Sequence, residues 1–323
     1  MNPPLIDLVC RSTGATRTTA WTPLQTLWSG YGKIYRVGLE HAEVPSVVVK
    51  MVTPPDVMDQ PRGWNTDQSH QRKLQSYQVE ASWYHDWNHR AAEVVRVAKC
   101  YAVEPINGGS AFVLEDLDAA GFPLRWNSPS LQEIRIGLNW LAKFHCHFMG
   151  ETPGELWHTG TYWHLATRPD ELSSMDTDDP LWIHASQIDQ RLSECEFPTL
   201  VHGDAKIANF CVAQDLQSIA AVDFQYVGGG CAMKDVVYFL GSCLSEKELT
   251  TRAGDLIESY FQDCRLSWRE GRKVSSFESE SRNLLAFAWA DFERFLCGWY
   301  PQHKKLTGYS RQMTELAIKS LRA

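Results

Sequence analysis

The sequence has no closely spaced cysteines, no long apolar run and no excess of basic residues. Nine cysteines are present, but the nearest two, Cys231 and Cys243, are twelve positions apart, and no CxxC motif occurs. An odd number of scattered thiols in a chain of 323 residues does not fit a disulfide framework. We therefore expect reduced cysteines and a cytoplasmic protein.

These absences exclude further classes of protein. No apolar stretch has the length of a membrane-spanning helix, and the first residues lack the charged and apolar regions of a signal peptide. The formal net charge of −8 argues against a nucleic-acid partner, which would require a basic face. Hydrophobic residues make up 44% of the chain and charged residues 22%, as in an ordinary globular protein.

Tryptophan, by contrast, is abundant, with 13 residues spread along the chain. Such large side chains commonly pack in a hydrophobic core. A second interpretation is that some of them line a pocket for a bulky or cationic ligand.

The pattern of expected elements changes near residue 117. Before it, β-branched and alternating segments predict strands at 24–28, 34–39, 47–52, 95–103 and 111–114, with one helix at about 70–89. After it, helices are predicted near 131–148, 181–195, 233–243, 246–264, 277–298 and 309–321, with a compact β segment at 199–223. We therefore predict an α+β fold with a small β-rich lobe at 1–117 and a larger, mostly helical lobe at 118–323.

The densest chemical signal is His-Gly-Asp-Ala-Lys-Ile-Ala-Asn at 202–209, followed by Asp-Phe-Gln at 223–225. A hairpin turning about Leu216 would place Asn209 opposite Asp223, to within one residue. Amide and carboxylate oxygens of this kind suit Mg²⁺, and Asp204 on the same loop remains free to accept a proton. Turn formation is the alternative role for each residue alone, but three in this arrangement favour a metal and catalytic site.

Two charges in the first lobe occupy positions where burial is expected. Lys50 ends an apolar strand, and Glu80 lies on the inward face of the predicted helix. A buried carboxylate needs a partner, so we predict a Lys50–Glu80 ion pair with Lys50 oriented toward phosphate oxygens. Glu80 alone would also fit a position at the helix flank. The turn containing Gly30 and Gly32 is a candidate to cover phosphates with backbone N–H groups, and no Walker A motif occurs.

The string His202-Gly203-Asp204, with Asn209 five positions later and Asp223 after that, resembles the aminoglycoside phosphotransferase and choline kinase superfamily. The Asp-Phe-Gln ending, together with Lys-Leu-x-Ser-Tyr-x-x-Glu at 73–80, is most similar to its ecdysteroid kinase-like branch. This resemblance covers roughly residues 25–300. It implies a two-lobed protein-kinase-like fold that uses ATP and Mg²⁺.

The resemblance also implies roles for individual residues. Asp204 would be the catalytic base, and Asn209 and Asp223 would hold Mg²⁺. Lys50 would contact the α- and β-phosphates with Glu80 as its partner.

It implies supporting roles as well. Glu115, Asp116 and Leu117 would form the hinge that contacts adenine through its backbone. His145 would end a helix of the second lobe, and Asp235 would be the structural aspartate that braces the catalytic loop.

Some residues depart from the family pattern or leave two interpretations open. Lys206 lies inside the catalytic loop, where it either neutralises the γ-phosphate or is solvated. The predicted helix 277–298 and the residues after it contain candidates for contacting the acceptor substrate. These are Trp289, Asp291, Trp299 and Tyr300, with Glu293 beside them, and core packing is the alternative for each.

Together these features predict a small-molecule kinase that transfers phosphate from ATP to a hydroxyl of an amino alcohol, an aminoglycoside or sugar, or a sterol-like compound. One alternative is a nucleotide-binding regulator with a kinase fold and little turnover. Another is a protein Ser/Thr kinase, which the absence of His-Arg-Asp, Asp-Phe-Gly and Ala-Pro-Glu sequences disfavours.

Overall fold

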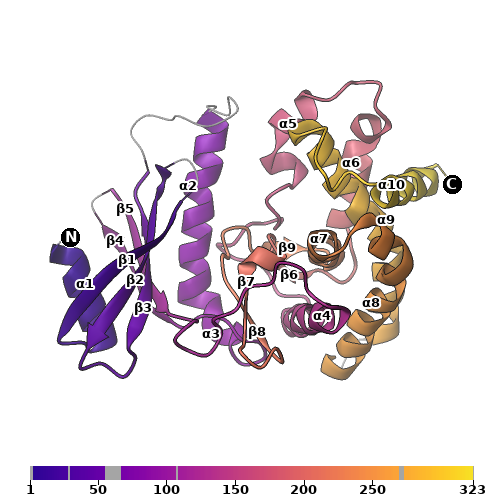
Figure 1. The fold of residues 1–323 in the computed structure, drawn as a ribbon. Coiled ribbons are helices and arrows are strands. Elements are labelled where there is room, and N and C mark those ends of the chain that lie inside the picture. Colours follow the sequence, from indigo (N-terminus) through magenta and orange to yellow (C-terminus); the bar gives the residue numbers. More distant parts are fainter. Residues whose placement is uncertain (1–2, 28–29, 55–66, 107, 269–272, 323) are drawn as a thin grey trace. The chain divides into compact units, whose positions relative to one another are not determined.

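The chain folds into two compact units, one rich in strands and one mostly helical. The computed structural model describes residues 3–27, 30–54, 67–106, 108–268 and 273–322. Unit 1 comprises Met1–Arg125 with Cys211–Val222, and unit 2 comprises Trp126–Phe210 with Asp223–Ala323. The predicted α+β class is confirmed (Figure 1). Unit 1 continues past residue 117 to Arg125 and includes the 211–222 hairpin.

Unit 1 is built on a five-stranded antiparallel sheet in the order β1-β2-β3-β5-β4. Its strands are β1 (Arg17–Thr26), β2 (Gly32–Glu40), β3 (Ser46–Val52), β4 (Cys100–Ile106) and β5 (Gly109–Glu115). The hairpin predicted around Gly30 and Gly32 is present as β1-β2, although Trp28 and Ser29 lie outside the described residues. The first strand begins at Arg17, well before the predicted residue 24.

The two faces of this sheet carry different helices (Figure 1). Helix α1 (Pro3–Thr13), which has no counterpart among the predicted elements, packs Leu5 and Leu8 against Val47 and Val49 of β3. Because side chains alternate along a strand, Lys50, the residue after Val49, points to the opposite face.

The helix predicted at 70–89 has three parts. It consists of α2 (Asp67–Ser82), a π-helical turn η3 (Trp83–Trp87) and α3 (Asn88–Ala91). The predicted strand 95–103 instead starts at Cys100, because residues 95–99 have other partners. Asn88 Nδ2 donates to Ala98 O (3.0 Å), and Val97 forms an isolated bridge with Ala221.

Unit 2 contains the helices expected after residue 117. They are α4 (Leu131–His147), α6 (Pro180–Ser193), α7 (Met233–Cys243), α8 (Glu246–Ser267), α9 (Val274–Trp299) and α10 (Gly308–Leu321). The short helix α5 (Pro169–Ser173) and the 3₁₀ turns η4 (Leu165–Thr167) and η5 (Ile207–Asn209) were not predicted. Capping boxes at Ser130, Ser245 and Thr307 fix the starts of α4, α8 and α10. An aromatic core of Trp163, Tyr238, Phe292 and Phe295 holds α7 against α9.

Two small β pairs frame the 202–209 segment. β6 (Thr199–Val201) pairs with β9 (Gly228–Gly230), and β7 (Phe210–Val212) pairs with β8 (Ile219–Ala221). The three consecutive glycines 228–230, a composition typical of a flexible loop, form the strand β9. A Cβ at Gly228 would lie 2.1 Å from Trp157 O, so glycine lets the segment from Trp157 pack directly on a buried strand.

The nine cysteines are free, as expected. Within the described ranges, none of the helices combines the length and apolar character that crossing a bilayer requires.

Candidate active site

The 202–209 loop is shaped by one glycine and one buried carboxylate. Gly203 has φ +79°, and a Cβ there would lie 1.9 Å from Tyr226 O, so only glycine fits. Asp235 at the start of α7 is fully buried and accepts the N–H groups of His202 (2.5 Å) and Gly203 (3.0 Å). It also contacts His145 Nε2 at 3.2 Å. The brace predicted for Asp235 is therefore present.

His145 belongs to this structural network. Its Nδ1 is 2.9 Å from the hydroxyl of Tyr260 in α8, and its carbonyl accepts from Thr199 Oγ1 (2.7 Å). The ring thus connects α4, α7 and α8, the arrangement of a buried structural histidine.

Hydrogen bonds from neighbouring side chains reach only one of the two carboxylate oxygens of Asp204 among the described residues. Lys206 Nζ donates to Asp204 Oδ2 at 2.6 Å, and Asn209 Nδ2 donates to the same oxygen at 2.9 Å and to Asp204 O at 2.8 Å. The other oxygen, Oδ1, is buried and has no hydrogen-bond partner among the described residues. A buried carboxylate oxygen without a donor is costly unless a ligand supplies one.

The charges around Asp204 act on one another. Burial, reinforced by the nearby carboxylate of Asp223, holds the pKa of Asp204 above its ordinary value even though Lys206 opposes the shift. Burial disfavours the charged form of Lys206, but the carboxylates of Asp204 and Asp223 raise its pKa overall. Lys206 is therefore an ion-pair partner of Asp204, and its contact with the γ-phosphate stays a prediction.

Asp223 takes a backbone conformation that side chains rarely adopt. Its φ is +67°, in the left-handed region, and non-glycine residues held there are concentrated at functional sites. Its Oδ1 accepts from Gln225 Nε2 at 2.7 Å. The bond from Ala213 N to Ser218 O sets the hairpin register and extrapolates to Asn209 opposite Val222. This agrees with the predicted register to within one residue.

These residues fit a Mg²⁺ ion better than a transition metal. Within the described part of the chain, no group of three or more His, Cys, Asp or Glu side chains is placed to hold a metal. Mg²⁺ needs only one or two protein ligands beside water and phosphate. Because Asn209 turns its amide nitrogen to Asp204, its Oδ1 faces away from that bond and is available as an oxygen ligand with the Asp223 carboxylate.

In unit 1, the predicted ion pair between Lys50 and Glu80 is present. Lys50 Nζ lies 2.8 Å from Glu80 Oε1 and 2.7 Å from Oε2, and both side chains are buried. The ammonium also lies 5.5 Å from the ring centre of Tyr77 and 6.0 Å from that of Phe112. The pairing explains how two charges are accommodated under the sheet.

The two glycines of the β1-β2 turn differ. Gly32 has φ +142°, and a Cβ there would lie 1.9 Å from Met51 O, so glycine is required where β2 runs beside β3. Gly30 has φ +75° with open space around it. Gly32 is thus explained by the sheet itself, and phosphate contact at either glycine stays a prediction.

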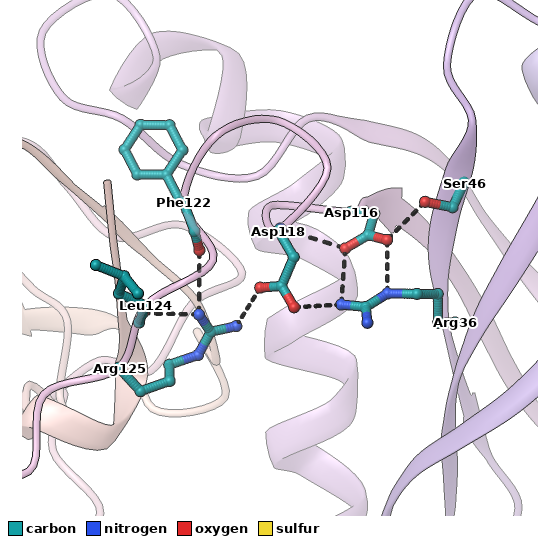
Figure 2. A network of polar contacts seen from close by, with 7 residues as sticks. All are labelled: Arg36, Ser46, Asp116, Asp118, Phe122, Leu124 and Arg125. Atoms are coloured by element: carbon teal, nitrogen blue, oxygen red, sulfur yellow. Dashed lines mark hydrogen bonds and ion pairs between the residues drawn. The ribbon is translucent and has the colours of Figure 1, made fainter. Parts of the chain in front are cut away.

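The predicted hinge residues use their side chains for structure. Figure 2 shows Asp116 bound to Arg36 Nε (2.7 Å) and to Ser46 Oγ (2.6 Å). Arg36 and Arg125 in turn hold Asp118, the latter at 2.9 Å. This network fixes the chain where it leaves β5.

The side chains of the two residues beside Asp116 also have structural roles. Glu115 pairs with Arg96 at 2.6 Å, and Leu117 is buried. Among the described residues, the Leu117 N–H has no hydrogen-bond partner, which leaves a backbone donor for a ligand.

The candidates for substrate contact have structural partners. Asp291 is fully buried between Lys234 (3.1 Å) and Arg294 (2.8 Å) and accepts from Trp163 Nε1. Trp289 is buried against Tyr309, Trp299 stacks on Phe295 at 5.6 Å, and Tyr300 lies beside His303. The charge of Asp291 is therefore already neutralised.

Three residues that the sequence did not single out lie near Asp204. They are Tyr162, Tyr238 and Lys305, and the charge of Asp204 acts on each of them. They come from three distant segments and form no motif, so no local signal in the sequence marks them.

Comparison with solved structures identifies the class of fold. The microcompartment-associated aminopropanol kinase has a TM-score of 0.53 and 16% identity, with 99% of this chain and 98% of that chain covered. A putative fructosamine-3-kinase from Haemophilus somnus 129PT has a TM-score of 0.51 and 14% identity, with 99% and 97% covered. The chain therefore has the kinase-like fold.

Comparison with family models gives the more particular result. Residues 182–268 match the ecdysteroid kinase-like family, and this span contains the 202–209 loop, Asp223 and Asp235. No curated protein matches the sequence significantly. The predicted resemblance to the ecdysteroid kinase-like family is confirmed over these residues.

Proposed function

We propose that the protein is an ATP- and Mg²⁺-dependent phosphotransferase that phosphorylates a hydroxyl group of a small molecule. The observation that carries this proposal is the state of Asp204. One of its oxygens is fixed by Lys206 and Asn209, and the other is buried without a partner among the described residues. This is the arrangement of an oriented base that receives a substrate hydroxyl.

Asp204 orients the acceptor hydroxyl and takes its proton as the bond to phosphorus forms. A general base works best when its pKa lies closer to the working pH, and the pKa of Asp204 is raised by burial and by Asp223. Phosphoryl transfer otherwise requires positioning and charge stabilisation more than covalent chemistry. Lys206 supplies a positive charge beside the base, suited to neutralising the transferred phosphate.

Asn209 and Asp223 hold the Mg²⁺, which when bound neutralises phosphate oxygens. Two features of the chain orient these residues for binding Mg²⁺. The hydrogen bonds from Asn209 Nδ2 to Asp204 turn the amide oxygen outward, and Asp235 keeps the preceding loop in place. Asp223 adopts a strained left-handed backbone conformation because this conformation orients its carboxylate toward the metal.

Lys50 contacts phosphate oxygens of ATP, and Glu80 holds its ammonium in position. The two bonds to Glu80 and the burial of both side chains hold the Lys50 ammonium at a fixed position beside β3. Adenine is bound by the backbone at 115–117, where the unpaired N–H of Leu117 offers one donor.

The comparisons support a small-molecule acceptor. The two structural neighbours are named for an aminopropanol and a fructosamine, and the matching family for ecdysteroids. These acceptors differ in chemistry but share an alcohol group and a small size.

A screen of ATP consumption tests the proposal. The protein is incubated with Mg-ATP and each of a panel of amino alcohols, aminoglycosides, sugars and sterols, and ADP and the phosphorylated product are measured. We expect product with at least one acceptor, and none when the panel is repeated with Asp204→Asn. ATP hydrolysis without any phosphorylated acceptor would favour a regulator instead.

A further inference from the structure

A lysine remote in sequence lies close to Asp204. Lys305 belongs to the connection between α9 and α10 and is partly buried. Its Nζ lies 4.6 Å from the ring centre of Tyr238 and 5.7 Å from that of Phe292. Within the described residues, this ammonium makes no hydrogen bond and no ion pair. Aromatic faces attract a cation but do not neutralise its charge.

Two tyrosines connect this lysine to the candidate base. The rings of Tyr238 and Tyr162 are 5.5 Å apart, and the Tyr162 N–H donates to Gly203 O at 3.1 Å, next to Asp204 in the chain. Tyr162 and Lys305 are only partly buried, whereas Tyr238 is almost completely covered. The cluster is defined as Tyr162, Asp204, Tyr238 and Lys305. Beside Asp204 itself, Tyr162 and Lys305 are therefore the members that a bound molecule can touch.

The pKa shifts of Tyr162 and Lys305 agree with their position near Asp204. Burial, and then the carboxylate of Asp204, raise the pKa of Tyr162 above its ordinary value. Burial lowers the pKa of Lys305 to about 8, and Asp204 opposes that shift. Both tyrosines therefore stay neutral donors at pH 7, and Lys305 stays mostly protonated.

The acidic residues that would attract a cationic acceptor are occupied elsewhere. Asp291 is neutralised by Lys234 and Arg294. Glu293 is buried and accepts from Thr314 Oγ1 at 3.2 Å. Beside the Asp204–Lys206 ion pair and the candidate metal ligand Asp223, the remaining charge near Asp204 in this cluster is the positive charge of Lys305.

We propose that Lys305 determines which acceptor reaches Asp204, selecting alcohols that are neutral or anionic near the reacting hydroxyl and rejecting those that carry an ammonium there. This inference rests on the proposed function, because it assigns the acceptor side of that site. It narrows the acceptor class away from amino alcohols and aminoglycosides.

Three probes with one shared body test the selection. Benzyl alcohol, 4-(hydroxymethyl)benzoate and 4-(aminomethyl)benzyl alcohol are neutral, anionic and cationic at pH 7. Their dissociation constants are measured by ligand-observed NMR with the full chain, so that no turnover is needed. The wild type is compared with Lys305→Met and with Lys304→Met, an exposed neighbouring lysine that serves as the matched control.

We expect the wild type to bind the anionic and neutral probes more tightly than the cationic probe. At the effective dielectric constant of about 20 that applies near a protein surface, two charges about 7 Å apart interact strongly enough to change affinity about 50-fold. Lys305→Met should remove most of this difference, and Lys304→Met should retain it.

Several outcomes would overturn the inference. These are binding of the cationic probe as tightly as the neutral one, a difference that survives Lys305→Met, or no binding of any probe. An equal loss of turnover for all acceptors in Lys305→Met, with binding unchanged, would instead place Lys305 on the transferred phosphate. Discrimination in binding without transfer to any acceptor would contradict the proposed function and leave the selectivity of Lys305 standing. Efficient phosphorylation of amino alcohols would support the proposed function and contradict the selectivity of Lys305.

Discussion

At the scale of single residues, the chemistry depends on how each polar atom of the 202–209 loop is used. Asp204 Oδ2 is occupied by Lys206 and Asn209, whereas Oδ1 is left for a ligand. The Asn209 amide is oriented by the same contact. The hydrogen bonds at Asp204 Oδ2 therefore orient both Asp204, the candidate base, and Asn209, a candidate metal ligand.

Replacing Asp204 by Asn should abolish transfer while leaving the fold and Mg-ATP binding intact. The change keeps the shape of the side chain but removes the proton acceptor, so kcat should fall by roughly 10²–10⁴-fold. Product formation and calorimetric ATP binding are measured together. Asp178→Asn, at an exposed position, is the control and should behave as the wild type. Turnover of Asp204→Asn at the wild-type rate would contradict the assignment of the base.

Replacing the two candidate metal ligands should weaken Mg²⁺-dependent ATP binding to different degrees. Asp223→Ala removes a full charge and should eliminate the Mg²⁺ dependence, whereas Asn209→Ala removes a neutral oxygen and should have a smaller effect. Calorimetric titrations with ATP, with and without Mg²⁺, give the order. Unchanged Mg²⁺ dependence in Asp223→Ala would place the metal elsewhere.

At the scale of secondary structure, one ion pair connects a strand to a helix. Lys50 on β3 and Glu80 on α2 meet across the face of the sheet opposite α1, where both are buried. Such a pair contributes more through the penalty of breaking it than through its net stability. The function of the pair is to fix the position of the Lys50 ammonium.

A double-mutant cycle on Lys50 and Glu80 should be strongly non-additive in ATP affinity. Lys50→Met should cause most of the loss by itself, and adding Glu80→Gln should cost little more, because Glu80 acts through Lys50. Lys50→Met should also lower the unfolding free energy by about 3–5 kcal/mol, since it leaves a buried carboxylate unpaired. The exposed pair Arg17–Glu40 is the control and should have little effect on either quantity. Additive losses in affinity would mean that the two residues act independently.

At the scale of the whole molecule, a buried cluster of charges holds the helices of unit 2 together. Asp291 of α9 lies between Lys234 of α7 and Arg294, and Arg294 Nη2 also donates to Trp163 O at 2.8 Å. Although burial opposes its charge, the two cations lower the pKa of Asp291 to about 2. The stability from this carboxylate is therefore complete above its unfolded pKa of about 4 and is lost as the pH falls through about 2.

Asp291→Asn should consequently destabilise the protein in a pH-dependent way. At pH 7 the unfolding free energy should fall by about 3–5 kcal/mol, because two buried cations lose their counter-ion. The difference from the wild type should shrink as the pH decreases from about 4 toward 2. Urea unfolding of both proteins at pH 7 and pH 3 measures this, with Asp178→Asn as the exposed control. An equal difference at both pH values would show that the effect of the substitution does not depend on the charge of Asp291.

The sequence by itself determined the α+β class, the positions of the main helices, the polar motif at 202–209 and the Lys50–Glu80 pair. These features follow from periodicity, from spacing over a few residues, or from a buried charge that requires a partner. Helix α1 and the strand at 228–230 were not predicted, because a short amphipathic segment and a run of glycines acquire their structure from the chain packed against them.

Only the tertiary structure decided which charges remain available around Asp204, the candidate base. Asp291 was a plausible partner for a cationic substrate until Lys234, 57 positions earlier in the chain, was seen to neutralise it. Lys305 carried no signal until the fold brought it to Tyr238 and into the field of Asp204. Compensation of a buried charge depends on distances in space, and contacts between remote segments leave no local pattern in the sequence.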